Sequence, residues 1–512
     1  MLHTLSPSAT RSLDERLRDA MTLFGFTALS DAQEKLIRAQ FDGHDVLGIL
    51  PTGGGKSACY QLPGIVLRHK TIVISPLIAL QEDQIKKLRQ RGVKAFAFHS
   101  NMDDAAKKTT IFYYKKLVRD DEASFLYLSP EILLTESFRH HFGHIQFDRI
   151  AVDEAHCVST WGDSFRPDYQ RIKTAVGKMN IKHCCAFTAT TDLKIERDIL
   201  ERIPLKKDVV KVEMSPVRPN LEISVREVPI VPGESMKIRG RKKFAKFLKL
   251  LSDPKYVGPT IVYCSSRRGT ESLFVRTIKM KGFLRTYGYT SYLFHANIEY
   301  DLKIEALRGF TTDARPIVFA TSAFGMGIDR GDVRQIIHYN LPITLIDYAQ
   351  QIGRGGRDGK PALCTMLRAP IVRSSPNLAL GMPSYYDVER RLKSILKDVS
   401  KFSPEKRKRY TLAHYRKRIS IWPEDYFGGG KDNYLAKVNA SIAILLRAGY
   451  LEDSKSGLIV RELESGSEAQ LKLLELTHMH ERMIERERGR IEKFFTAQRP
   501  DQQLLWQMLK TE

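Results

Sequence analysis

The sequence lacks long apolar runs. No stretch of eighteen consecutive apolar residues occurs in the 512-residue chain, and the segment from Met1 to Pro7 has no apolar core of the kind found in secretory signal peptides. These absences argue against a membrane-spanning helix and against entry into the secretory route. We therefore expect no membrane partner.

Cysteines are few and scattered. The six cysteines are Cys59, Cys157, Cys184, Cys185, Cys264 and Cys364. No two of them form a C-x-x-C pair and none follows Cys364, so the spacing argues against a zinc site and against a disulfide framework. Most stand beside apolar, strand-like residues, which favours reduced cysteines buried in domain cores. No zinc is expected.

Acidic residues are scarce relative to basic ones. The chain has 59 Asp and Glu against 82 Lys and Arg, a formal net charge of +23. This excess predicts a polyanionic partner, either nucleic acid or an acidic membrane surface, and the missing apolar spans favour nucleic acid. The content of 42% hydrophobic and 28% charged residues is typical of a soluble globular protein. The length corresponds to about three or four domains.

A glycine-rich stretch follows the apolar pair Val46 and Leu47. It reads Ile49-Leu50-Pro51-Thr52-Gly53-Gly54-Gly55-Lys56-Ser57 and precedes a segment able to begin a helix. Consecutive glycines let backbone N–H groups turn inward around a polyphosphate at a helix N-terminus, where the dipole favours anions. Lys56 would reach the β- and γ-phosphates of ATP, and the Ser57 hydroxyl would hold Mg²⁺. Because Leu50 replaces the first glycine of the strict pattern, a glycine-rich surface turn is the alternative.

Helical patterns precede this loop. Residues 12–42 place apolar side chains at helical spacing, with an interruption at Phe24-Gly25-Phe26. Phe26 and Gln33 are close enough to the loop in sequence to stack on an adenine base and to hydrogen-bond to it. The alternative for these two residues is core packing and a solvated helix face.

Short apolar runs alternate with amphipathic helices after the loop. The runs cover residues 71–75, 95–98, 125–128 and 149–152. This alternation predicts a parallel sheet covered on both faces, with the ligand outside the carboxyl ends of the strands. Asp153 and Glu154 stand at such an end. There, an Asp can hold Mg²⁺ and a Glu can orient or deprotonate the water that attacks the γ-phosphate.

Several motifs together resemble those of a known family. They read Asp153-Glu154-Ala155-His156, Phe187-Thr188-Ala189-Thr190, Ala323-Phe324-Gly325-Met326-Gly327-Ile328-Asp329 and Gln350-Gln351-Ile352-Gly353-Arg354-Gly355-Gly356-Arg357-Asp358-Gly359. In order and spacing they are similar to the helicase motifs of superfamily 2, and specifically to those of the RecQ family of DNA helicases. The form of the phosphate loop without its first glycine is also this family's version. The resemblance covers about residues 20–366.

The resemblance implies an α/β protein with two tandem RecA-like doubly wound parallel-sheet domains and a mainly helical C-terminal region. Two prolines between Met214 and Asn220 break the strand and helix pattern, so the ATP-binding first domain is expected over residues 1–214 and the second over residues 215–368. Two such sheets bracket one nucleotide.

Two arginines of the second domain are candidates to complete the catalytic site. Arg354 and Arg357 lie three residues apart, so on one helical turn both can point toward the γ-phosphate held by the first domain. An arginine supplied in this way stabilises transition-state charge only when the domains close. The sequence leaves open which of the two is the arginine finger, and surface salt bridges are the alternative for either.

The resemblance also assigns contacts to the nucleotide. It implies that Phe26 stacks on adenine and that Gln33 bonds to the edge of the base, although Ser30 stands where the family usually carries an arginine. The other residues expected to bind the nucleotide are Thr52, Gly53, Gly54, Gly55, Gly327, Asp329 and Gln350.

A loop rich in aromatic residues directly follows the Asp-Glu pair. Residues 157–169 are similar to the loop by which RecQ enzymes couple single-strand binding to hydrolysis. Trp161 and Phe165 offer faces for base stacking and Arg166 offers charge, whereas the alternative is a buried aromatic cluster that braces the loop. The remaining nucleic-acid contacts are expected from Ser75 and Pro76.

Beyond the last helicase motif the resemblance weakens. RecQ proteins commonly continue into a four-cysteine zinc module, which this chain has no cysteines to build. Residues 369–430 are expected to form a helical basic connector, in which Lys406 to Arg418 suit phosphate contact, a solvated charge run or a nuclear address. Residues 431–465 are expected to form a winged-helix element whose tip, Asp453 to Gly457, has no aromatic wedge. Residues 466–512 are expected to form C-terminal helices.

These features predict an ATP- and Mg²⁺-dependent DNA helicase. The family implies 3′→5′ translocation on single-stranded DNA and unwinding of tailed or forked duplex DNA in repair or recombination. One alternative is an ATP-driven annealing, remodelling or RNA-unwinding motor. Another is a nucleic-acid-binding scaffold whose ATPase has decayed, against which the intact Lys56, Asp153 and Glu154 argue. We expect a location in the cytoplasm with the nucleoid in a prokaryote, or in the nucleus of a eukaryote, and the oligomeric state is left open.

Overall fold

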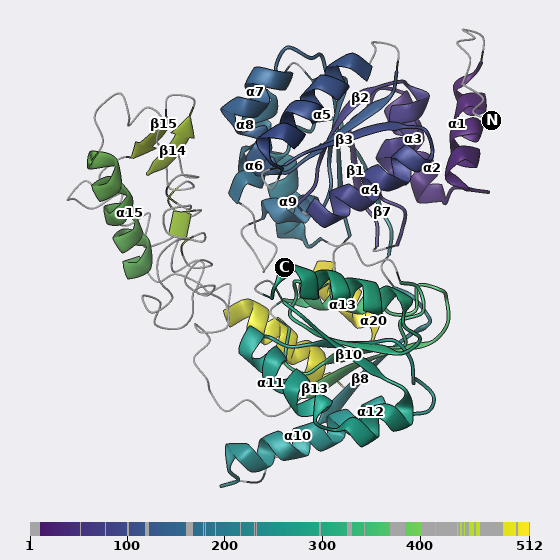
Figure 1. Ribbon diagram of the computed structural model, residues 1–512, viewed down its shortest axis with the longest axis vertical. Coiled ribbons are helices and arrows are strands. Elements are labelled where there is room, and N and C mark those ends of the chain that lie inside the picture. The colour runs from purple at the N-terminus through teal and green to yellow at the C-terminus, as the bar shows by residue number, and fades with distance from the viewer. Residues whose placement is uncertain are drawn as a thin grey trace.

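Two α/β domains and a C-terminal region follow one another along the chain (Figure 1). The computed structural model describes residues 11–51, 53–76, 78–99, 102–117, 122–159, 167–177, 179, 181–189, 191–215, 217–229, 231, 233–295, 298–324, 330–342, 344–368, 385–401, 415, 438, 441–442, 445, 450–454, 457–460, 485–497 and 500–510. Within these ranges, no helix is both long enough and apolar enough to cross a bilayer.

The first domain is built on a seven-stranded parallel sheet in the order β3-β4-β2-β5-β6-β1-β7. Its strands are β1 (Val46–Ile49), β2 (Lys70–Ile74), β3 (Lys94–Phe98), β4 (Ser124–Leu128), β5 (Arg149–Val152), β6 (His183–Thr188) and β7 (Val210–Glu213). Every residue of β1, β2, β4 and β5 is buried, because helices cover both faces of the sheet. This burial explains the near-continuous apolar runs in the sequence.

The helices of the first domain begin and end at recognisable signals. For example, the side chains of Ser12 and Glu15 cap the start of the first helix reciprocally, and Gly25 ends it at φ 72°. The helices are α1 (Leu13–Phe24), α2 (Asp31–Phe41), α3 (Ala58–Val66), α4 (Ile78–Gln90), α5 (Asp104–Leu117), α6 (Pro130–Leu133), α7 (Glu136–Phe142), α8 (Ile172–Val176) and α9 (Leu193–Arg202), with short 3₁₀ helices η1 (Ala155–Val158) and η2 (Pro167–Arg171).

The second domain has a six-stranded parallel sheet in the order β10-β11-β9-β12-β13-β8. Its elements are β8 (Leu221–Glu227), α10 (Met236–Leu251), β9 (Thr260–Tyr263), α11 (Arg267–Ile278), α12 (Lys281–Tyr287), β10 (Thr290–Phe294), α13 (Tyr300–Thr312), β11 (Pro316–Ala320), β12 (Gln335–His338), α14 (Leu345–Ile352) and β13 (Ala362–Arg368). The predicted α/β fold with two parallel-sheet domains is confirmed. The predicted division at residue 214 falls between β7 and β8.

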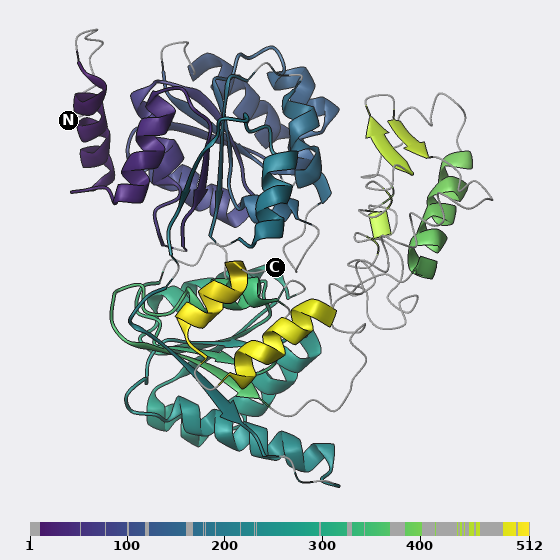
Figure 2. The ribbon, with the colours of Figure 1, turned by 180° about the vertical axis from the view of Figure 1, so that it is seen from behind.

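The C-terminal region separates into two parts. The first contains α15 (Tyr385–Ser400) and an antiparallel hairpin of β14 (Leu451–Ser454) and β15 (Gly457–Val460), which stand apart from both domains (Figure 1). The second contains helical residues 485–496 and α20 (Gln502–Lys510), which return to the second domain, as Figure 2 shows in yellow.

Two predictions for the C-terminal region fall largely outside the described residues. The hairpin stands where the strands of the expected winged helix lie, but most of residues 431–449 are not described, so the winged helix stays a prediction. Of the basic run from Lys406 to Arg418, only Tyr415 is described, and its ring is buried.

Candidate active site between the two domains

The phosphate loop joins β1 to α3 and has the backbone of a tight glycine turn. Gly53 and Gly55 have φ values of 85° and 73°, a region that glycine adopts at little cost. A methyl group on Gly54 would stand only 2.9 Å from the carbonyl oxygen of Pro51. The turn ends at Ser57, the N-cap of α3, whose side chain makes no capping hydrogen bond. The N-terminus of α3 therefore directly follows the loop and has no side-chain cap, which is the arrangement of an anion-binding site at a helix N-terminus.

Side chains from the ends of two further strands meet this loop. Lys56 Nζ lies 3.5 Å from Oε1 of Glu154, which follows β5. The other oxygen of Glu154, Oε2, lies 3.4 Å from Nδ1 of His156, and that nitrogen lies 3.1 Å from Oγ1 of Thr188 at the end of β6. Because β5, β6 and β1 are neighbours in the sheet, their carboxyl ends bring these four groups to one edge.

Glu154 has a backbone conformation that is unusual for a residue with a side chain. Its φ and ψ are 48° and 47°, in the left-handed region. Such a conformation costs on the order of 1–3 kcal/mol and is common at functional sites. The Glu154 N–H donates a 2.9 Å hydrogen bond to Oδ1 of Asp153, which helps to hold this turn. The turn aims the Glu154 carboxylate at Lys56.

The two carboxyl groups of this turn differ in pKa. Burial, and then the neighbouring Glu154 carboxylate, raise the pKa of Asp153 to about 7, although Lys56 opposes this shift. Burial also acts to raise the pKa of Glu154, but Lys56, His156 and Arg354 outweigh it and hold the pKa below its usual range. Glu154 is therefore ionised at neutral pH. A divalent cation beside Asp153 would favour its ionised form as well.

The second domain reaches the site through α14. Nε2 of Gln350 lies 3.5 Å from Nε2 of His156, so the two motifs that contain these residues touch across the domain boundary. Burial lowers the pKa of His156, which keeps the imidazole neutral between Glu154 and Gln350. The contact gives the second domain a direct link to the Glu154 carboxylate.

The two candidate finger arginines follow the end of α14. The positive charge of Arg354 contributes to the lowered pKa of Glu154, and the Arg354 side chain is 9% exposed. Arg357 lies against the phosphate loop, since a methyl group on Gly53 would stand 3.6 Å from its Cδ. The structure thus brings both arginines to the same site as Lys56.

The donor set suits a magnesium–nucleotide complex. The Ser57 hydroxyl and the Asp153 carboxylate are oxygen donors, which Mg²⁺ prefers, and Mg²⁺ usually combines one or two carboxylates with substrate phosphates. In the described part of the chain, no group of three or more His, Cys, Asp or Glu residues is arranged to hold a metal ion. A site shared between protein oxygens and phosphate oxygens agrees with both observations.

Comparison with known proteins bears on these motifs. Residues 30–198 match the DEAD/DEAH box helicase family, and residues 242–359 match the helicase conserved C-terminal domain. The chain is 34% identical over 347 residues to the probable ATP-dependent DNA helicase RecS of Bacillus subtilis, covering 68% of this chain and 65% of RecS. It is 32% identical over 363 residues to the ATP-dependent DNA helicase RecQ of Synechocystis, covering 70% of this chain and 71% of that protein.

The chain belongs to the RecQ family of ATP-dependent DNA helicases. It spans slightly less than two thirds of the length of RecS. Among solved structures, the helicase MrfA bound to DNA and AMPPNP superposes with a TM-score of 0.56 at 20% identity, covering 71% of this chain and 51% of MrfA. That likeness supports the RecA-like helicase fold of the two domains.

The RecQ adenine segment has an arrangement that the sequence did not predict. Oε1 of Gln33 accepts a 2.9 Å hydrogen bond from the Ser30 N–H, which caps α2, and Nε2 of Gln33 donates a 3.2 Å hydrogen bond to the Gly54 carbonyl. The Gln33 amide thus ties the segment to the phosphate loop. Phe26 stacks on Phe24 with ring centroids 6.3 Å apart. Adenine binding by Phe26 and Gln33 stays a prediction.

Several predicted RecQ residues lie outside the described residues. They are Thr52, Trp161, Phe165, Arg166, Gly327 and Asp329. Ser75 and Pro76 are described and buried at the end of β2, where the Ser75 N–H donates a 3.1 Å hydrogen bond to the Leu128 carbonyl. Their contact with nucleic acid stays a prediction.

Three residues without a predicted role complete the site. His156 and Thr188 stand within RecQ motifs, and that position is the signal that could have marked them. The Tyr169 hydroxyl donates a 3.0 Å hydrogen bond to the Asp153 carbonyl and the ring is fully buried. No local pattern distinguishes this tyrosine from other aromatic residues of the loop.

Proposed function

We propose that the chain is an ATP-dependent DNA helicase that couples ATP hydrolysis to 3′→5′ translocation on single-stranded DNA and to duplex unwinding in repair or recombination. The observation that carries this proposal is the meeting of Lys56 and Glu154 of the first domain with Arg354 and Arg357 of the second. A site divided between two domains favours a motor, because hydrolysis then depends on domain closure.

Each residue has a distinct role in the proposed hydrolysis. The backbone N–H groups of Gly53, Gly55, Lys56 and Ser57 and the Lys56 ammonium bind the β- and γ-phosphates, whereas the Gly54 N–H donates a 2.8 Å hydrogen bond to the Pro51 carbonyl. Ser57 and Asp153 hold Mg²⁺, which would neutralise charge on the phosphate oxygens when bound. Glu154, ionised and directed into the site, orients the attacking water and accepts its proton.

The arginines supply the charge that the transition state requires. Negative charge spreads over the oxygens of the transferred phosphoryl group, and an arginine from the second domain stabilises it there. Gln350, in contact with His156, gives the second domain a further means of sensing the nucleotide. Hydrolysis and release of phosphate would remove the anion that holds the domains together, so each ATP would drive one cycle of closing and opening.

DNA is the nucleic acid that the available observations favour. The net charge of +23 supports binding to phosphates, and the relatives RecS and RecQ are named as DNA helicases. We infer that Trp161, Phe165 and Arg166 contact single-stranded DNA beside the catalytic turn. The proposed substrates are tailed or forked duplexes, and the proposed location is with the nucleoid or in the nucleus.

A strand-displacement assay tests the proposal. The expected result is ATP-dependent release of a labelled strand from a duplex with a 3′ single-stranded DNA tail, and little release from a 5′-tailed or blunt duplex. An RNA duplex of the same sequence and tail length is the matched control. Displacement of the RNA duplex at an equal or higher rate would favour an RNA-unwinding motor, and ATP hydrolysis without displacement of any duplex would contradict helicase function.

A further inference from the structure

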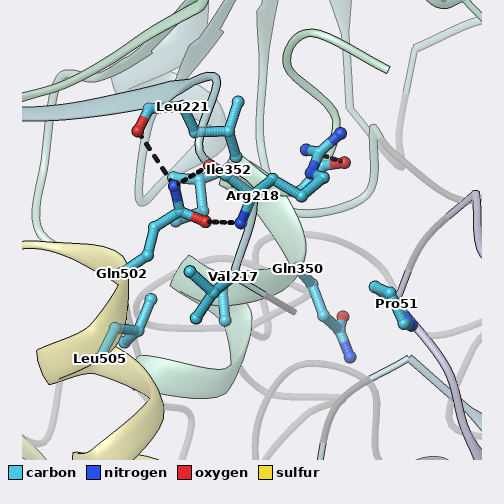
Figure 3. A pocket seen from close by; sticks show the side chains of 10 residues that line it. Pro51, Val217, Arg218, Leu221, Gln350, Ile352, Gln502 and Leu505 are labelled. Carbon is cyan, nitrogen blue, oxygen red and sulfur yellow. Dashed lines mark hydrogen bonds between the residues drawn. The ribbon is translucent and has the colours of Figure 1, made fainter. Parts of the chain in front are cut away.

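Gln502, at the start of α20, binds the backbone at the end of the linker between the two domains, which we define as residues 214–220 between β7 and β8. Its Oε1 accepts a 2.7 Å hydrogen bond from the Arg218 N–H, and its Nε2 donates to the carbonyls of Arg218 and Leu221 at 2.5 and 3.0 Å. Figure 3 shows this side chain reaching from α20 to both residues. One amide thus makes three hydrogen bonds to the backbone of Arg218 in the linker and of Leu221 at the start of β8, which lie 284 and 281 residues away in sequence.

The linker in turn holds the turn that carries the candidate finger arginines. Nη2 of Arg218 donates a 2.9 Å hydrogen bond to the carbonyl of Gly353, the residue before Arg354. Nδ2 of Asn220 donates a 2.7 Å hydrogen bond to the carbonyl of Gly356, the residue before Arg357. Each arginine is therefore preceded by a residue whose carbonyl is bound by a linker side chain.

This turn fits closely around the linker. Gly356 has a φ of 52°, and a methyl group placed on it would stand 2.5 Å from Nδ2 of Asn220. Asn220 also donates a 2.8 Å hydrogen bond to the carbonyl of Lys360, beyond the turn. Movement of the linker would therefore move the backbone of the turn, and with it both arginine side chains.

Helix α20 is firmly anchored on the second domain. Leu505, Met508 and Leu509 are buried in the same apolar cluster as residues of α14. In that cluster, the Tyr348 ring of α14 packs 5.7 Å from the Phe494 ring and 5.0 Å from the Phe495 ring, measured between centroids. The apolar face of α20 thus fixes the position from which Gln502 reaches the linker.

The other end of α20 contacts the first domain. Lys510 forms an ion pair with Glu213, the last residue of β7. Near its start, Gln502 and Leu505 line a small pocket that extends to Pro51 of the phosphate loop and to Gln350 of α14 (Figure 3). The helix therefore lies where the two domains and the linker meet.

We propose that Gln502 is a positioning residue for ATP hydrolysis, which places Arg354 and Arg357 by holding the linker at Arg218. This proposal rests on the proposed ATPase function. Gln502, Arg218 and Asn220 all lie outside residues 30–198 and 242–359, which match the helicase families. The chain thus recruits its own C-terminal helix to complete a site built from the two helicase domains.

The proposal predicts a specific kinetic signature. An arginine finger stabilises the transition state much more than it stabilises the complex of the enzyme with ATP. A misplaced finger therefore lowers kcat and leaves KM nearly unchanged. A displacement of about 1 Å at a catalytic group can cost about 10²-fold in rate. Loss of the Gln502 bonds is therefore expected to lower kcat at least about tenfold while the KM for ATP changes less than about twofold.

The test compares Gln502→Met with Gln507→Met in the full chain. Both replace a glutamine of α20 by an unbranched side chain of similar length and helix propensity, but Gln507 is exposed on the same helix. Steady-state ATP hydrolysis is measured with saturating single-stranded DNA. The expected result is a lower kcat for Gln502→Met and wild-type kinetics for Gln507→Met. Equal kcat for both variants, in a wild type that hydrolyses ATP, would overturn the proposal.

A second measurement separates positioning from a merely structural role. Affinity is measured for ADP and for ADP with aluminium fluoride, a mimic of the transferred phosphoryl group. Gln502→Met is expected to bind ADP as wild type does and to lose at least about tenfold in affinity for the fluoride complex. Equal losses for both ligands, or a lowered melting temperature that accounts for the lost rate, would show that Gln502 only stabilises the fold. A wild type without ATPase activity would instead contradict the proposed function itself.

Discussion

Arg357 of the second domain lies against Gly53 of the first, so close that a methyl group on Gly53 would stand 3.6 Å from Cδ of the arginine. A phosphate group held by the loop would therefore bind within reach of a positive charge from the other domain. The positive charge of Arg354, in the same turn as Arg357, helps to lower the pKa of Glu154 in the first domain. The proposed nucleotide site would consequently be incomplete in either domain alone.

This arrangement predicts the kinetics of arginine variants. Arg354→Ala and Arg357→Ala are each expected to lower kcat for ATP more than they change KM. Substitution of the arginine that acts as the finger is expected to lower kcat about 10³- to 10⁵-fold. The larger effect identifies the finger. The control is Arg285→Ala on α12, a helix on the side of the second domain that faces away from the first (Figure 1). If neither site variant lowers kcat below that of the control, the second domain does not take part in hydrolysis.

The phosphate loop gives a second prediction. Lys56→Ala is expected to remove nearly all ATP hydrolysis, with and without DNA, because the phosphate loop then lacks the ammonium group that binds the β- and γ-phosphates. DNA binding, measured by fluorescence anisotropy at one salt concentration, should be retained, since the proposed DNA contacts of Trp161, Phe165 and Arg166 are distinct from the phosphate loop. Lys35→Ala on the exposed side of α2 is the matched control. Turnover in Lys56→Ala equal to that of Lys35→Ala would remove the loop from the mechanism.

A buried histidine predicts how stability depends on pH. Burial lowers the pKa of His338 from 6.5 to about 4, although Oε1 of Gln351 lies 2.7 Å from its Nε2 and opposes the shift. As the pH falls, His338 therefore binds a proton near pH 6.5 in the unfolded chain but only near pH 4 in the folded chain. Stability should fall as pH falls through this window, by about 3 kcal/mol from this residue in total.

The measurement is the urea midpoint of wild type and His338→Gln at pH 7.5 and pH 5. The variant loses the packing of the imidazole against the Tyr263 and Tyr348 rings, so its midpoint is expected to be lower at both pH values. Its decrease between pH 7.5 and pH 5 should nevertheless be smaller than that of wild type. An equal decrease in both proteins would show that His338 does not contribute to the pH dependence.

Metal analysis gives a further prediction. The purified protein is expected to contain no stoichiometric zinc, because all six cysteines are buried within the two α/β domains. Burial raises the pKa of Cys59, Cys264 and Cys364 to about 12, which disfavours the thiolate that zinc would need. The measurement is inductively coupled plasma mass spectrometry after dialysis against a chelator. One retained zinc per chain would contradict this reading of the C-terminal region.

The domain architecture and the positions of the candidate catalytic residues could be predicted from sequence because their signals are local. Strands such as β2 and β5 are buried on both faces and are therefore continuous apolar runs. Asp153 and Glu154 follow such a run directly, so their position at the sheet edge follows from the strand itself. The expected hairpin after residue 450 also agrees with β14 and β15.

Long-range pairing could not be predicted in the same way. Gln502 and Arg218 are joined by hydrogen bonds across 284 residues, and neither stands in a recognisable pattern. The Gln33 amide also donates a hydrogen bond to the Gly54 carbonyl, 21 residues away, and no local pattern predicts that contact. The position of α20 depends on apolar packing against α14, which sequence periodicity does not specify.

The sequence of the loop at residues 157–169 leads to a prediction about the effect of DNA on ATP hydrolysis. Trp161 and Phe165 stand eight and twelve positions after Asp153, so stacking of bases on them would pull on the turn that holds Glu154. Stacking is worth about 1–3 kcal/mol per base. Trp161→Ala is expected to keep basal ATP hydrolysis, to weaken DNA binding modestly and to lose most of the stimulation by single-stranded DNA. Stimulation equal to wild type would show that the loop is only a structural brace.

The central proposal is a nucleotide site that is shared by two domains and controlled by DNA. Its most direct test is the rate of ATP hydrolysis as a function of single-stranded DNA concentration. It is measured in one buffer and at one salt concentration, with Lys56→Ala as the inactive reference. We predict that the wild-type rate rises with DNA to a plateau well above its basal value, while Lys56→Ala stays inactive throughout. A wild-type rate that is the same at every DNA concentration, or no higher than that of Lys56→Ala, would contradict the account.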